Sequence, residues 1–204
     1  MTHDIRQFAT IAVDWNGTIV DDVDRAFHAT VTSLNGIGLI RLAPADLDQF
    51  RTAFTLPMEA FFAGLEVPDK LIDNCITRWN TAMMTIPATL APGAQKLLRG
   101  ARDAGVPVIV ISGAHEDVIK RDSEKLGIST LIDHIYGGVH PKRNILRRYA
   151  MKGPIAYFGD TIYDVEEGIA AGATTIAVDF GYGKRESFTS VTPIVSNLSD
   201  VFLL

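Results

Sequence analysis

Polar residues follow the short apolar runs of this chain, at the points where a sheet of parallel strands would bind a ligand. In open α/β sheets, ligands bind beyond the carboxyl ends of the strands, so these residues are candidates for one shared site. They are Asp14 after residues 8–13, Ser112 and Gly113 after residues 106–111, and Asp160 after residues 155–158.

A strand-end carboxylate such as Asp14 can attack phosphorus and form an aspartyl phosphate when the phosphoryl charge is neutralised. The Ser112 hydroxyl, backbone amides at a helix start, a lysine and Mg²⁺ can together neutralise that charge. Lys142, which begins a helical segment, is the candidate lysine. Asp14 and Asp160 would hold the metal, because Mg²⁺ prefers one or two carboxylates with phosphate and water. Asp164 would bind the metal through water or orient Asp160.

Each of these residues alone has an ordinary explanation. Strand-end Asp and Ser residues often cap turns and helices, and a lone lysine is usually a surface charge. The ordered set is therefore far more specific than any one member of it.

The second half of the chain alternates apolar runs with amphipathic segments. Residues 94–101 have the i, i+3, i+4, i+7 spacing of a helix, and Gly105 and Pro107 end it before the next apolar run. Strand and helix alternation of this kind predicts an α/β fold with a doubly wound parallel sheet and right-handed crossovers. Further helices are expected over 115–126, 141–150 and 163–171, and further strands over 134–138 and 174–178.

Residues 21–88 break this alternation. Their helical stretches are interrupted by glycines and prolines, which predicts a helical insert. We therefore expect a core domain of residues 1–20 and 89–204 and an inserted domain of residues 21–88.

The composition excludes several classes of protein. The chain has 204 residues, 47% of them apolar, and its net charge of −5 comes without a long basic cluster, so we expect no nucleic-acid partner. It has no run of about 18 apolar residues and no signal-peptide pattern at its start, which predicts a cytoplasmic protein without a membrane partner. The single cysteine, Cys75, is interpreted as a packed side chain. The oligomeric state is left open.

Four segments carry a resemblance to a known family. They are DWNGT (14–18), VIVISG (108–113), HPKRN (140–144) and FGDTIYDVEEGIAAGATTIAV (158–178). In this order they resemble the four motifs of haloacid dehalogenase-like hydrolases, particularly the phosphoglycolate-phosphatase-like branch, over nearly the whole chain. A signalling receiver domain has its acidic metal pair before the phosphorylated Asp, and a nicotinamide-binding domain needs a G-x-G-x-x-G after its first strand, so neither fits.

The resemblance implies a Rossmann-like core with a central first strand and an α-helical cap inserted at residues 21–88. It implies that Asp14 is the nucleophile, that Ser112 and Lys142 bind the phosphoryl group, and that Asp160 binds Mg²⁺. The metal would also contact Asp14 and the backbone carbonyl of Asn16. The substrate would be a small phosphorylated metabolite, and Arg51 in the insert is either a contact for its anionic group or an exposed helix residue.

Asn16 is the departure from this pattern. The first motif of the family is normally Asp-x-Asp-x-Thr, and its second Asp protonates the leaving oxygen, which an amide cannot do at neutral pH. One hypothesis is a slow or specialised phosphatase that borrows an acid from Asp21, His115 or the substrate. The others are a phosphate binder without turnover, a deliberate Asp-to-Asn change, or an Asn-Gly pair that deamidates to an acid. We favour the first, because the rest of the set is present.

Overall fold

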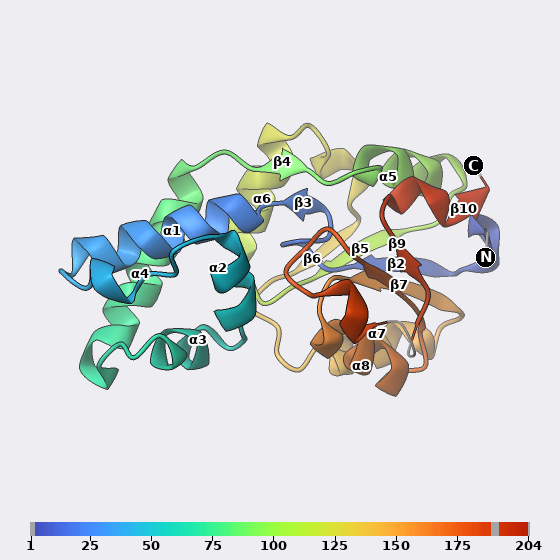
Figure 1. The fold of residues 1–204 in the computed structure, drawn as a ribbon. Helices are drawn as coiled ribbons and strands as arrows, with labels where there is room; N and C mark the ends of the chain where they lie inside the picture. The colour runs from blue at the N-terminus through green and yellow to red at the C-terminus, as the bar shows by residue number, and fades with distance from the viewer. Residues whose placement is uncertain (1–2, 189–191, 204) are drawn as a thin grey trace. The chain divides into compact units, whose positions relative to one another are not determined.

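The computed structural model describes residues 3–188 and 192–203. It divides into two compact units, a core unit of residues up to Asp21 and from Thr89 onward, and a helical unit of Asp22–Ala88 (Figure 1). Asp21 belongs to the core unit because it pairs with Thr89 in a two-stranded antiparallel ribbon. The ribbon is formed by β3 (Val20–Asp21) and β4 (Thr89–Leu90).

The core unit contains a parallel sheet of six strands, with β2 near its centre. This confirms the predicted doubly wound parallel sheet. Its first strand along the chain, β2, is central, as expected. The four residues of β2 are fully buried, as expected for a strand covered on both faces. In spatial order the strands are β6 (His134–Tyr136), β5 (Val108–Ile111), β2 (Thr10–Val13), β7 (Ile155–Gly159), β8 (Thr174–Val178) and β9 (Ile194–Val195).

The order of the strands reverses between β2 and β7. The chain runs from β2 outward to β5 and β6, and then returns to β7 and runs outward to β8 on the other side. Right-handed crossovers in opposite directions put the connecting helices on opposite faces of a sheet. Figure 1 shows α5 (Ala94–Asp103) and α6 (Glu116–Lys125) on one face, with α7 (Arg143–Ala150) and α8 (Ile162–Ala170) on the other.

The register of the sheet brings the expected site residues to one edge. Val13 lies opposite Val110 of β5 and Phe158 of β7, and the Asp14 amide donates to the Phe158 carbonyl at 2.9 Å. The residues that follow these three strands therefore lie at the carboxyl edge. Because the strand order reverses between β2 and β7, this is also the place where α/β sheets leave a crevice for a ligand.

The helical unit contains four α-helices, which make aromatic and polar contacts with one another. The Trp79 indole donates to the Ala26 carbonyl at 3.3 Å and to the Thr30 hydroxyl at 3.2 Å, and Phe50 packs edge-on against Phe61. The helices are α1 (Val23–Gly36), α2 (Leu47–Ala53), α3 (Met58–Gly64) and α4 (Asp69–Thr85).

A short parallel pair joins β1 (His3–Asp4) to β10 (Phe202–Leu203). Within residues 3–188 and 192–203, no helix has the length and apolar character needed to cross a bilayer.

Candidate active site

Asp14 is followed at once by a tight turn. Gly17 adopts a left-handed conformation with φ of 71°, and its amide donates to the Val20 carbonyl at 2.9 Å. This bond engages the amide nitrogen that would attack the Asn16 side chain during deamidation. Asn16 is the one residue from Ile11 to Val20 that is partly exposed.

Lys142 lies between two carboxylates. Its ammonium is 2.8 Å from Oδ1 of Asp14 and 2.6 Å from Oδ1 of Asp164, and all three side chains are buried. Burial alone would lower the pKa of Lys142, but the two carboxylates outweigh burial and raise that pKa above its ordinary value. The lysine therefore remains charged beside Asp14.

Asp164 is saturated with hydrogen bonds. Its Oδ1 accepts from the Lys142 ammonium and from the Tyr157 hydroxyl at 2.7 Å, and its Oδ2 accepts from the Thr161 amide at 3.2 Å and the Thr161 hydroxyl at 2.5 Å. Burial raises the pKa of Asp164, but Lys142 and the other donors lower it more, so the net shift is downward. Asp164 thus forms a buried ion pair with Lys142, a role that the sequence did not predict.

The Asp160 carboxylate contacts one backbone amide and one threonine hydroxyl. The Tyr182 amide donates to its Oδ2 at 2.6 Å, and the Thr18 hydroxyl lies 3.4 Å from its Oδ1. Burial raises the pKa of Asp160 well above its ordinary value, and the charges of Asp14 and Asp164 raise it further. These surroundings disfavour the charged form of the Asp160 carboxyl group.

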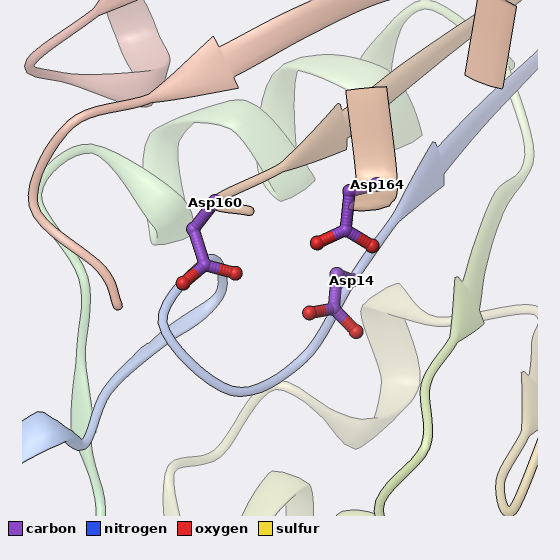
Figure 2. A group of neighbouring side chains, drawn as sticks. All are labelled: Asp14, Asp160 and Asp164. Atoms are coloured by element: carbon purple, nitrogen blue, oxygen red, sulfur yellow. The ribbon is translucent and has the colours of Figure 1, made fainter. Parts of the chain in front are cut away.

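The acidic cluster has the chemistry of a site for a hard divalent cation. One carboxylate oxygen from each of Asp14, Asp160 and Asp164 lies within 4.8 Å of the others, at the ends of β2 and β7 and the start of α8 (Figure 2). Burial raises the pKa of Asp14 to about 6, although Lys142 opposes that shift. Three buried carboxyl groups face a single ammonium, and oxygen ligands of this kind suit Mg²⁺. All three could hold a metal ion, and Asp164 already accepts four hydrogen bonds from the protein.

The other predicted residues have different surroundings. Ser112 is buried at the carboxyl end of β5, where its hydroxyl accepts from the Ala114 amide at 3.2 Å, and Gly113 beside it is exposed. His115 is exposed and caps α6 by accepting from the Asp117 amide. Arg51 belongs to α2 of the helical unit, so its contact with a substrate stays a prediction.

Several contacts within the site were missed in the sequence. Thr161 and Asp164 form a capping box at the start of α8, a pattern that their spacing of three residues does carry. Tyr157 lies in an apolar strand, and a buried tyrosine hydroxyl normally has a hydrogen-bond partner. The Tyr182 amide gives no signal in the sequence, because a backbone donor has no residue type.

Gly181 offers a first test of this geometry. A Cβ atom at this position would lie 2.2 Å from Oδ2 of Asp160, so Gly181→Ala must displace either the carboxylate or the loop that holds it. We expect this overpacking to lower the free energy of unfolding by about 1–3 kcal/mol. Gly64→Ala is the matched control, since nothing lies within 4 Å of its Cβ position. Thermal unfolding of both variants checks this, and equal midpoints would contradict the described packing.

The sequence matches the model of a known family over most of its length. The family is described as haloacid dehalogenase-like hydrolase, and the match covers residues 11–178. The chain belongs to this family. The match confirms the resemblance drawn from the four motifs, and it includes both Asp14 and Asp160. No curated protein sequence matches the chain significantly.

Solved structures of the family have the same fold. A haloacid dehalogenase-like hydrolase from Streptococcus pneumoniae has a TM-score of 0.81 at 18% identity, with 96% of this chain and 97% of that chain covered. A predicted phosphoglycolate phosphatase from Haemophilus somnus has a TM-score of 0.79 at 16% identity, with 96% of each chain covered. CbbY from Rhodobacter sphaeroides in complex with phosphate has a TM-score of 0.76 at 17% identity, with 96% and 97% covered. At these identities the likeness concerns the fold.

Proposed function

We propose that this protein is a Mg²⁺-dependent phosphatase of small phosphomonoesters that works through an aspartyl phosphate on Asp14. The observation that carries the proposal is the Lys142 ammonium, 2.8 Å from Asp14, in a buried cluster that also contains Asp160. A carboxylate nucleophile, a fixed positive charge and a metal-binding acid are the parts that phosphoryl transfer requires. The family resemblance and the phosphatases among the similar structures support the same reaction.

In the first step an oxygen of Asp14 attacks phosphorus, and the bond from phosphorus to the ester oxygen breaks. Lys142 and the Ser112 hydroxyl hold the phosphoryl oxygens, with Gly113 beside them. The leaving oxygen takes its proton from water, from the substrate or from an acid such as Asp21 or His115, because the Asn16 amide does not release a proton at neutral pH. Water then attacks the aspartyl phosphate, which releases phosphate and restores Asp14.

Asp14, Asp160 and the backbone carbonyl of Asn16 would hold the Mg²⁺ ion. When bound, the ion neutralises the charge on the phosphoryl oxygens and favours the ionised form of the two buried carboxyl groups. Replacing Asp by Asn at position 16 leaves a backbone carbonyl in place, so the proposed metal site does not depend on this side chain.

A second candidate function is suggested by Asn16 itself. A protein with the same site but no general acid can bind a phosphorylated metabolite and turn it over very slowly. The similar structures include a mutant of CbbY in complex with xylulose bisphosphate, which is a small phosphorylated sugar. We propose ligands of this class, and Arg51 of the helical unit as a contact for their anionic groups, for either function.

Phosphate release tests the proposal directly. Freshly purified protein with Mg²⁺ should release phosphate from at least one member of a panel of sugar, glycolate and aryl phosphates, and EDTA should abolish that release. Restoring Mg²⁺ should restore it. If no ester in the panel is hydrolysed but inorganic phosphate binds in calorimetry, the slow or non-catalytic binder is the better account.

A further inference from the structure

Helix α7 begins without a side-chain cap of its own. Its N-cap residue is Lys142, whose side chain makes no capping hydrogen bond and instead reaches Asp14 and Asp164. The first backbone amides of a helix have no partner within the helix and need one from elsewhere. Here the Lys142 amide donates to the Tyr163 hydroxyl at 3.3 Å, and the Arg143 amide donates to Oε2 of Glu167 at 2.7 Å. Both acceptors belong to α8.

Glu167 is a charged residue held entirely within the protein. It is 1% exposed, and while its Oε2 accepts from the Arg143 amide, its Oε1 lies 2.6 Å from the Arg143 guanidinium. Burying a carboxylate is costly unless its oxygens have partners, and here each oxygen has one. Glu167 thus links α8 to the first residue of α7 through one hydrogen bond and one ion pair.

Residues of α8 therefore contact both the side chain of Lys142 and the backbone at the start of α7. Asp164 takes the ammonium, while Tyr163 and Glu167 take the amides of Lys142 and of the residue after it. The Tyr163 ring is itself stacked on His140, with ring centroids 5.0 Å apart. A lysine side chain is flexible but has a limited reach, so its ammonium can lie between Asp14 and Asp164 only while the backbone of Lys142 stays within that reach.

We propose that Glu167 is a positioning residue for Lys142. Its carboxylate caps α7 from the neighbouring helix, and this keeps the Lys142 ammonium beside Asp14. The role of Lys142 in binding phosphate rests on the proposed function, whereas its position does not. The role of Glu167 lies in its acceptor oxygen for the Arg143 amide, and the ion pair with the guanidinium is secondary.

Three variants separate positioning from simple stabilisation. Glu167→Ala removes the acceptor and the charge, Glu167→Gln keeps an acceptor oxygen and removes the charge, and Glu166→Ala changes the exposed neighbour as a control. The full-length proteins are compared by NMR, which reports the hydrogen exchange of the Arg143 amide and the chemical shift of the Lys142 ammonium nitrogen. Calorimetry with Mg²⁺ and inorganic phosphate measures binding.

We expect Glu167→Ala to lose protection of the Arg143 amide and to move the Lys142 ammonium signal. Phosphate binding should weaken by about 10–100-fold, the usual effect of losing an outer partner of a site residue. Glu167→Gln should bind phosphate nearly as tightly as the unmodified protein, since it retains the cap. Glu166→Ala should match the unmodified protein in every measurement.

Two results would overturn the proposal. One is a Glu167→Ala protein that melts earlier but keeps the Lys142 ammonium signal unchanged, which would make Glu167 a stabilising residue alone. The other is a Glu167→Gln protein as impaired as Glu167→Ala, which would assign the effect to the ion pair. If the unmodified protein binds no phosphate, the proposed function fails, and the two NMR measurements still decide the role of Glu167.

Discussion

Replacing Asp14 with Asn is expected to reduce phosphate release by about 10⁴-fold or more, as the loss of a covalent nucleophile does in other hydrolases. An amide nitrogen does not attack phosphorus, and the change also removes a negative ligand from the metal site. The side chain keeps its size and an oxygen that can face Lys142, and Asp164 still compensates the ammonium. The variant should therefore fold.

Asp103→Asn is the matched control for this prediction. Asp103 is an exposed residue at the carboxyl-terminal end of α5, and its substitution makes the same chemical change outside the site. Phosphate release is measured for both variants with one substrate at saturating Mg²⁺, and circular dichroism checks that both are folded. An Asp14→Asn protein that retains more than about a tenth of the activity would remove Asp14 from the mechanism.

Replacing Asn16 with Asp is expected to have the opposite effect. It supplies the general acid that the first motif of the family normally carries, and such a group contributes about 10²–10⁴ in rate. The gain should be largest for alkyl phosphates, whose leaving oxygen needs a proton. Aryl phosphates have leaving groups that depart without one, so their phosphoryl-transfer step should change little.

The comparison of the two substrate types is what makes this result informative. Turnover of an alkyl and an aryl phosphate is measured for both proteins, and a burst of the aryl alcohol is measured separately from steady-state release. Position 16 also affects the activation of water, so the breakdown of the aspartyl phosphate can limit aryl substrates in both proteins. A variant that hydrolyses both types as slowly as the unmodified protein would favour the phosphate-binding function.

The strands that could be predicted are those whose own residues form a recognisable pattern. The apolar runs that became β2, β5, β7 and β8 are short, buried and bounded by turn residues, and a strand end fixes where its next side chain lies. The reversal of strand order then placed Asp14 and Asp160 on neighbouring strands at one edge. Short strands such as β9, with two residues, lack this signal.

Contacts between distant elements were not predictable in the same way. We expected Asp164 to bind the metal through water or to orient Asp160, and its hydrogen bonds with Lys142, Tyr157 and Thr161 were not foreseen. Which of several acids a lysine meets depends on how α7 and α8 pack, and periodicity does not carry that information. The ion pair between Glu167 and Arg143 was not predicted for the same reason. In the sequence, each is an ordinary charged residue of a helix.

The central claim, an aspartyl phosphate on Asp14, is tested most directly by acid quenching during turnover. The protein is mixed with Mg²⁺ and a substrate labelled on phosphorus, quenched in acid within the first turnovers, digested, and mapped by mass spectrometry. Without an acid at position 16 the intermediate should break down slowly, so we expect label on the peptide that contains Asp14. Phosphate release with no labelled protein, or with the label on another residue, would contradict the mechanism.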